Sequence, residues 1–162
     1  MTIGIVADTH DNLARIDQAV AFLNERRVQL VLHAGDIVAP FAMLRFGMLT
    51  CRLVAVFGNN DGEHEGLCRT CNTFQATIHE PPYVLQLAGR SILMVHDIDM
   101  ISPKNRGEYD IIVCGHTHHA KLEQEHDTLI LNPGECGGWI SGIATLALLD
   151  VAGATAQIHT LD

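Results

Sequence analysis

The sequence predicts an α/β fold in which two packed β-sheets are covered by helices. In the first half of the chain, short apolar runs typical of buried strands alternate with helical patterns, as in parallel βαβ units. In the second half strands follow one another directly, and two connections, Ala88-Gly89 and Ala152-Gly153, have the composition of hairpin turns. About ten strands are more than one small mixed sheet usually holds, which favours two sheets.

Each predicted element rests on its own local pattern. Two helices are expected, over residues 12–26, where apolar side chains recur at helical spacing, and over residues 40–49, which begin with a proline. The polar segment 62–73 lacks a clear period and is expected to be a connection. Strands are expected over residues 2–7, 30–34, 52–57, 76–79, 83–87, 90–95, 110–114, 121–124, 129–132, 143–150 and 154–159.

The whole chain, residues 1–162, is expected to form a single domain. A chain of this length can bury about 70% of the surface that it exposes when unfolded. No repeat, low-complexity tract or Ser/Gly linker marks a boundary, and no apolar run approaches the ~20 residues of a membrane helix. The first residues lack the basic start of a signal peptide, so we expect a cytoplasmic location without membrane contact.

The charge balance excludes one large class of partners. With 10 Lys and Arg against 19 Asp and Glu, the formal net charge is -9, and no basic cluster stands out. A protein that binds long nucleic acids is expected to carry a positive face, so such partners are excluded. The odd number of cysteines, 5, indicates reduced thiols. The one CxxC pair, Cys68 and Cys71, lacks the second pair of a structural zinc site.

Polar residues able to bind metals follow five of the predicted strands. The motifs are Asp8-Thr9-His10, Gly35-Asp36, Gly58-Asn59-Asn60-Asp61, His96 and Gly115-His116-Thr117-His118. In α/β sheets the carboxyl ends of strands open into the loops where ligands bind. Each motif alone is weak evidence, but their joint occurrence in this order predicts one active site. Carboxylate, amide and imidazole groups without thiolates suit Mn²⁺, Fe or Zn²⁺, and the set can hold two divalent ions.

This series of motifs resembles the signature of the calcineurin-like metallophosphoesterases. In its small size, the chain is similar to members of their single-domain prokaryotic phosphodiesterase branch. The resemblance implies a four-layer α/β/β/α sandwich of two mixed sheets flanked by helices, with the site at one edge of both sheets. It also implies two coordination shells that share Asp36 as a bridge. The other expected ligands are Asp8, His10 and His118 for one ion, and Asn59, His96 and His116 for the second.

The function that the resemblance implies is hydrolysis of a small phosphate ester, first of all a phosphodiester, by in-line attack of a metal-bridging hydroxide. The expected ions are two Mn²⁺, with Ni²⁺, Zn²⁺, Fe or Co²⁺ as alternatives, and the expected catalytic residues are Asp36, Asn59 and His118. One alternative is a phosphomonoesterase. Another is a non-catalytic scaffold that binds protein partners, as a retromer subunit of this fold does, although every ligand position is filled here. The sequence leaves a homo-oligomer open.

Three positions depart from the family pattern. Asn60 stands where larger relatives have a histidine that serves as general acid, a role that an amide cannot take at neutral pH. We therefore expect either better turnover of esters that have stable leaving groups, such as aryl phosphodiesters, or protonation of the leaving group through water or a nearby histidine. Asp97 follows His96 where relatives often continue with Gly-His, which affects substrate specificity. Glu135 follows the turn 132–134, which is either part of the site or an ordinary Asn-Pro-Gly turn.

Other polar residues near the motifs have competing interpretations. His33 is expected to be a hydrogen-bonded core residue rather than a ligand, and Asp61 either orients a ligand or caps the connection that follows it. Asn12 and His119 could contact either phosphate or solvent. The remaining histidines are expected at the surface: His64, His79, His126 and His159.

Overall fold

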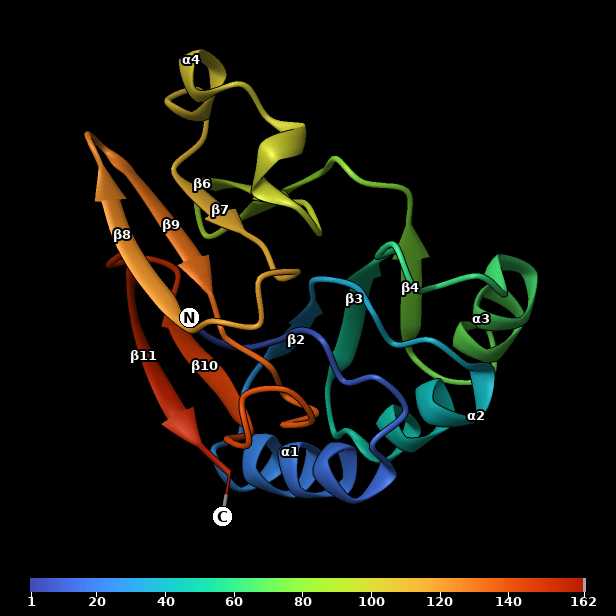
Figure 1. Ribbon diagram of the computed structural model, residues 1–162. Helices are drawn as coiled ribbons and strands as arrows, with labels where there is room; N and C mark the ends of the chain where they lie inside the picture. Colours follow the sequence, from blue (N-terminus) through green and yellow to red (C-terminus); the bar gives the residue numbers. More distant parts are fainter. Residues whose placement is uncertain (162) are drawn as a thin grey trace.

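Two mixed sheets form the centre of the computed structural model, which describes residues 1–161 (Figure 1). From edge to edge, sheet A consists of β11 (Thr155–Thr160), β10 (Thr145–Asp150), β1 (Thr2–Val6), β2 (Leu30–His33), β3 (Arg52–Val56) and β4 (Ala76–His79). Sheet B consists of β5 (Tyr83–Leu87), β6 (Arg90–Met94), β7 (Ile111–Val113), β9 (Thr128–Asn132) and β8 (Lys121–Glu125). The expectation of two sheets is therefore confirmed.

Helices form the outer layers of a four-layer arrangement. The face of sheet A away from sheet B is covered by α1 (Leu13–Glu25), α2 (Pro40–Met43), the 3₁₀ helix η1 (Leu44–Met48) and α3 (His64–Cys71). On the far side of sheet B the layer is thinner, with only η2 (Ile98–Met100) and α4 (Pro103–Arg106) among the described residues. Figure 1 shows α4 at the opposite end of the molecule from α1, and the α/β/β/α prediction is confirmed.

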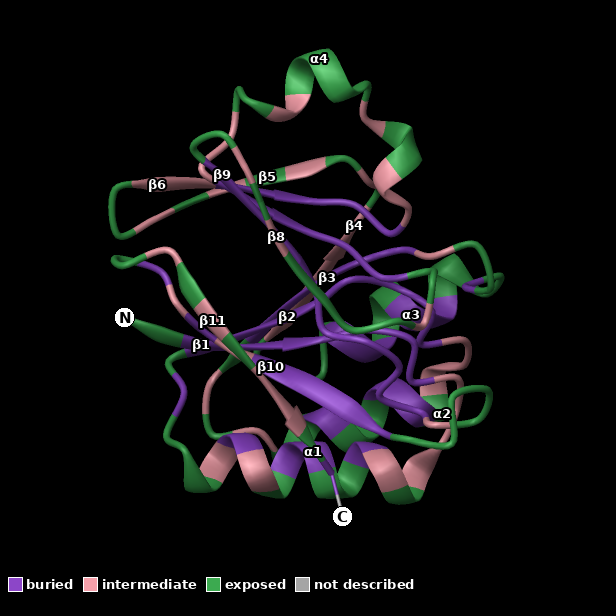
Figure 2. Cartoon of the chain, turned by 60° about the vertical axis from the view of Figure 1, so that its left-hand side comes forward, coloured by how far each residue is buried: buried purple, intermediate pink, exposed green. Residues whose placement is uncertain are grey.

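Alternation along the strands divides the apolar side chains between two cores. In β1, Val6 packs in the core under α1, whereas Ile3 and Ile5 pack in the core between the two sheets. Successive side chains of a strand point to opposite faces, so each central strand contributes to both cores. The buried strands are purple in Figure 2, whereas much of α4 and β11 is intermediate or exposed. None of the described helices is long and apolar enough to cross a membrane.

The strand directions bring the predicted motifs to one edge. β1, β2, β3 and β4 are paired in parallel, and so are β6, β7 and β9, while the antiparallel strands lie outside these runs. The last residues of β1 and β2, Val6 and His33, are register partners, as are Met94 and Val113 at the ends of β6 and β7. Chain segments that leave these strands therefore start side by side.

The structure corrects two of the predicted elements. Segment 62–73 was expected to be a connection, but it contains α3, whose buried Leu67 and Cys71 lie one turn apart against sheet A. Too few apolar residues recur at helical spacing for the local pattern to predict this helix, so its formation depends on packing against sheet A. The expected helix over residues 40–49 divides instead into α2 and η1, because the chain tightens into a 3₁₀ turn at Leu44.

Replacing Leu32 with alanine should destabilise the protein strongly. The Leu32 side chain has no exposed surface and packs between the two sheets. Because the change leaves a cavity, the free energy of unfolding is expected to fall by about 2–5 kcal/mol, measured by urea denaturation. The control is Val84→Ala on edge strand β5, whose side chain is 44% exposed. Equal losses in the two variants would contradict this assignment of the core.

Candidate metal centre

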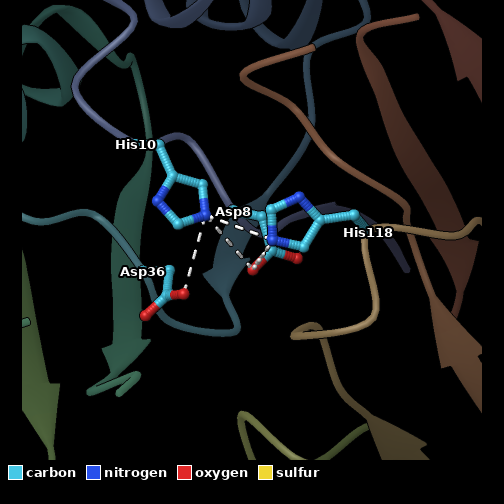
Figure 3. Close-up of side chains that lie close together, drawn as sticks. All are labelled: Asp8, His10, Asp36 and His118. Carbon is cyan, nitrogen blue, oxygen red and sulfur yellow. Dashed lines mark hydrogen bonds and ion pairs between the residues drawn. The ribbon is translucent and has the colours of Figure 1, made fainter. Parts of the chain in front are cut away.

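Four side chains converge beyond the carboxyl ends of β1, β2 and β7, and are called here the carboxylate–histidine cluster (Figure 3). The ligand atoms of Asp8, His10, Asp36 and His118 all lie within 4.8 Å of one another. His10 Nε2 is 3.3 Å from His118 Nε2 and 3.6 Å from Asp36 Oδ2, and His118 Nε2 is 3.8 Å from Asp8 Oδ1. Both carboxylates are buried. Residues more than a hundred positions apart thus meet in one small volume.

His96 extends this cluster from sheet B. Its Nδ1 lies 2.8 Å from the backbone oxygen of Ala34, and because that oxygen can only accept, Nδ1 carries the proton. The Nε2 atom of the neutral ring then has a lone pair, which lies 3.3 Å from Asp36 Oδ2. This buried Nε2 makes no hydrogen bond with any described residue. A lone pair that faces a carboxylate in the protein interior requires a cation or a proton between the two atoms.

Asn59 and His116 lie at the exposed margin of the cluster and contact each other. His116 Nδ1 is 2.9 Å from Asn59 Oδ1, and the His116 ring centroid is 5.1 Å from that of His96. The other ring nitrogen of His116, Nε2, lies 3.9 Å from Asp97 Oδ2. Both residues are exposed, unlike the buried Asp36 and His96. The seven predicted site residues therefore share one edge of the two sheets, with these two at its open side.

Hydrogen bonds beyond the strand ends hold the loops of the site together. Asp8 N donates to Gly35 O over 3.0 Å in sheet A, and Gly115 N donates to His96 O over 2.9 Å in sheet B. Between the sheets, His116 N lies 3.1 and 3.2 Å from the two carboxylate oxygens of Asp8. The Asp8 carboxylate therefore fixes the position of the His116 loop as well as belonging to the cluster.

Asp61 joins the loops that follow β2 and β3. Its carboxylate accepts the backbone N–H groups of Asp36, Val38 and Gly58 over 3.0, 2.6 and 2.7 Å. The pKa of Asp61 is raised, mainly because the carboxyl group is buried and also because Asp36 repels its charge. The hydrogen bonds act in the opposite direction but do not outweigh burial. Of the two interpretations of Asp61, orientation of the Asp36 loop is the one that these contacts support.

Strained backbone is concentrated at the predicted site residues. Five of the seven have positive φ: 53° at Asp8, 42° at His10, 60° at Asp36, 70° at His116 and 60° at His118. This left-handed conformation costs a residue other than glycine about 1–3 kcal/mol, and persists only where the surrounding structure imposes it. Strain gathered at polar residues of this kind is a feature of functional sites.

Burial and hydrogen bonds shift the two carboxylates of the cluster in opposite directions. Burial raises the pKa of Asp8, partly offset by its histidine neighbours. Burial also acts to raise the pKa of Asp36, but the contact with His96 and the hydrogen bonds from Asn60 outweigh it, so this pKa is lowered. Burial acts to lower the pKa of His96, but the contact with Asp36 outweighs it and raises that pKa. A cation placed between Asp36 and His96 would interact favourably with both groups.

The donor atoms of the cluster fit divalent metal ions. Two buried carboxylates in close proximity need positive charge to compensate them. The His118 ring has a related placement: Nδ1 lies 3.3 Å from Glu135 Oε1, an ion-pair distance without a hydrogen bond, and Nε2 faces the cluster. Histidines that bind metals usually direct one ring nitrogen at an oxygen acceptor and the other at the ion. The geometry therefore agrees with the chemistry that the residue types indicate.

Glu135 supports both histidines of the cluster. Its carboxylate is buried and accepts the backbone N–H groups of Trp139, Ile140 and Ser141 over 2.8, 3.0 and 2.9 Å. Burial acts to raise its pKa, but these hydrogen bonds outweigh burial and lower the pKa to about 2. The Trp139 indole N–H donates in turn to the backbone oxygen of His10 over 3.0 Å. No local motif signals these contacts, since they depend on how the loop after β9 folds back.

A pocket of about 340 Å³ opens beside Asn59, His96 and His116. The rest of its lining consists of Phe57, Gly58, His64, Glu80, Pro81, Asp97 and Met100. It thus adjoins the exposed margin of the cluster, contains several apolar or aromatic side chains, and has no lysine or arginine among its lining residues. An organic group attached to a phosphate at the cluster could occupy this space.

Comparison with known proteins assigns the chain to a family. The model of a calcineurin-like phosphoesterase superfamily domain matches residues 1–154. The chain belongs to this superfamily. The resemblance seen in the motifs and the expected enzyme class, a phosphoric ester hydrolase, are confirmed. A phosphodiesterase of Methanocaldococcus jannaschii is 34% identical to this phosphoesterase over 155 residues, which are 93% of each chain. A probable metallophosphoesterase of Methanothermobacter thermautotrophicus is 28% identical and covers 83% of this chain and 76% of its own.

Solved structures show the same fold. An archaeal phosphodiesterase superimposes on this phosphoesterase with a TM-score of 0.93 and 31% identity, covering 99% of this chain and 100% of its own. The Escherichia coli phosphoesterase YfcE has a TM-score of 0.73 at 19% identity, and zinc-bound Vps29 of Entamoeba histolytica has 0.69 at 18%. Both of these cover the full length of each chain, and at such identities they are similar in fold alone.

Several supporting residues of the phosphoesterase can now be placed. His33 is buried in the core, as expected; Gly35 N donates to its Nδ1 over 3.2 Å, and burial lowers its pKa to about 3. Asn132 donates to the backbone oxygen of Gly115 over 2.7 Å, so the Asn-Pro-Gly turn does support the site. Asn12 is the N-cap of α1 and donates to Gly137 O over 2.7 Å.

Replacing Gly58 with alanine should damage the site. A methyl group at this position would collide with the backbone nitrogen and Oδ1 of Asp36. Since backbone cannot move aside as a flexible side chain can, Asp36 must shift, and we expect a loss of about 1–3 kcal/mol in stability together with lower hydrolytic activity. The control is Gly62→Ala in the same connection, where an added Cβ meets nothing within 4 Å. Equal behaviour of the two variants in urea denaturation and ester hydrolysis would contradict this prediction.

Proposed function

We propose that this phosphoesterase is a phosphodiesterase that uses two divalent metal ions. The observation that carries the proposal is the orientation of the histidines in the cluster. His96 and His118 each direct Nδ1 at an oxygen and Nε2 toward a carboxylate, at 3.3 Å from Asp36 and 3.8 Å from Asp8 respectively. Lone pairs arranged in this way around buried negative charge are suited to cations.

The proposed ligands divide into two groups that share Asp36. Asp8, His10 and His118 would hold one ion, and their close convergence supports this group. Asn59, His96 and His116 would hold the second, supported by the contact of His96 with Asp36 and by the proximity of the His116 ring. Oxygen and imidazole donors without thiolate favour Mn²⁺, with Ni²⁺, Zn²⁺, Fe and Co²⁺ as alternatives.

In such a site two divalent ions supply charge compensation on the phosphate oxygens and acidify water so that it can attack at neutral pH. The side chains of this chain would perform the remaining tasks. Asp36 would set the spacing of the two groups, and Asn59 at the exposed margin would help to orient the phosphate. His118, which lies beside Glu135, would face the charge that develops on the phosphate oxygens during attack in line with the leaving oxygen.

The pocket beside the cluster favours a diester over a monoester. Its lining has no lysine or arginine, but does contain the carboxylates of Glu80 and Asp97. A monoester dianion carries one more negative charge than a diester, so these carboxylates would repel it more strongly. The diester also has a second organic substituent, for which the pocket offers space. A small substrate rather than a long nucleic acid belongs to this proposal, supported by the net charge of -9 and the lack of a basic cluster.

Protein reloaded with Mn²⁺ should hydrolyse bis-p-nitrophenyl phosphate faster than p-nitrophenyl phosphate, and should contain two ions by elemental analysis. Asp36→Asn and His116→Ala should abolish hydrolysis, because the first removes the negative charge of the proposed bridge and the second removes a proposed ligand. His10→Ala should also lower the metal content. The control His126→Ala changes an exposed histidine outside the site and should leave both measurements unchanged.

Two results would count against the proposal. Preference for the monoester would replace the diesterase by a phosphomonoesterase. Two bound ions without hydrolysis of any ester, in Mn²⁺, Ni²⁺, Co²⁺ or Zn²⁺, would indicate a scaffold.

A further inference from the structure

Hydrolysis of an ordinary phosphodiester requires a proton for the departing oxygen. An alkoxide or phenoxide is a poor leaving group unless an acid protonates it as the P–O bond breaks. Asn60 has no acidic proton, and both its backbone N–H and its side-chain N–H donate to Asp36 over 2.8 Å. The residue next to the proposed ligand Asn59 is therefore occupied with positioning Asp36 and does not serve as an acid.

Three histidines line the pocket beside the cluster, and two of them are already committed. His96 donates from Nδ1 to Ala34 O and directs Nε2 at Asp36. His116 contacts Asn59 through Nδ1 and belongs to the proposed ligands. The third, His64, is the first residue of α3 and stands outside the proposed metal shells. It is thus the histidine of this pocket that is available for proton transfer.

His64 is held in a defined orientation although its side chain is 47% exposed. Its ring stacks on that of Phe57, with centroids 3.8 Å apart and planes 4° from parallel. Its Nδ1 lies 3.2 Å from Oε1 of Glu80, which follows β4 and also lines the pocket. With Nδ1 directed at this carboxylate, Nε2 is the ring nitrogen that remains for proton transfer to a group in the pocket.

We propose that His64, oriented by Glu80, is the general acid of this enzyme, an inference that rests on the proposed phosphodiesterase function. As the bond between phosphorus and the leaving oxygen breaks, the electron pair of that bond stays on the oxygen. The proton on His64 Nε2 passes to the same oxygen, which departs as a neutral alcohol. The imidazole is left neutral and takes a new proton from solvent. His64 thus interacts with the ester group that lies in the pocket, while Glu80 is a positioning residue.

The test is a series of methyl aryl phosphodiesters whose leaving groups range from p-nitrophenol to phenol. His64→Asn should lower kcat/KM for methyl phenyl phosphate by about 10²-fold, the usual contribution of a general acid. It should affect methyl p-nitrophenyl phosphate by less than about threefold, because p-nitrophenoxide departs without protonation. The dependence of the rate on the leaving group should therefore become steeper. Glu80→Gln should steepen it to a smaller extent, acting on kcat rather than KM, and Glu80→Asp should restore part of the loss.

The matched control is His79→Asn. His79 also stacks on an aromatic ring, that of Tyr83, with centroids 3.8 Å apart, but it is not among the residues that line the pocket. This variant should retain the wild-type dependence on the leaving group. Metal content and thermal melting of all variants show whether fold and metal loading are intact.

The outcomes separate this inference from the function on which it rests. If wild-type protein hydrolyses none of the diesters, the proposed phosphodiesterase function fails. If wild-type protein is active, and folded, metal-loaded His64→Asn slows all esters equally or none of them, the assignment of His64 is overturned.

Discussion

The parallel pairing of β1 with β2 and of β2 with β3 is the constraint on which the site depends. Parallel neighbours end at the same edge of a sheet, so the loops that carry Asp8, Asp36 and Asn59 leave sheet A side by side. The hydrogen bond from Asp8 N to Gly35 O extends this pairing beyond the strands. Asp61 then fixes the loops after β2 and β3 to each other through three charge-assisted hydrogen bonds. The side chains of Asp8, Asp36 and Asn59 come together because these hydrogen bonds fix the conformation of the loops that carry them.

The same constraint explains how strained backbone persists at the site. Left-handed φ at Asp8, Asp36 and His118 would be costly in an isolated loop. Here the cost is offset by hydrogen bonds that exist only in the folded chain, such as those of Asp61 with the Asp36 loop. Glu135 makes a comparable contribution on the other side, where it binds the backbone of residues 139–141 and contacts His118.

The sequence predicts the fold well wherever local pattern and tertiary packing agree. The strands over 76–79 and 83–87 have the expected limits, and the hairpin at Ala88-Gly89 is present. The prediction from sequence fails for α3, where Leu67 and Cys71 belong to the buried face and most neighbouring residues are polar. The gathering of the polar motifs at one edge could be predicted, because each motif follows a strand. The contacts of Glu135, Trp139 and His64 could not, since no local period reports which loops fold back toward the site.

The carboxylate–histidine cluster joins the two halves of the molecule. Asp8, His10 and Asp36 come from loops of sheet A, whereas His118 comes from a loop of sheet B and lies beside Glu135, which follows β9. During synthesis, Asp8, His10 and Asp36 leave the ribosome long before His118, the histidine that completes the cluster. An ion bound by all four residues therefore has no complete site until sheet B has docked on sheet A, so metal capture would be a late step of folding that locks the two sheets together.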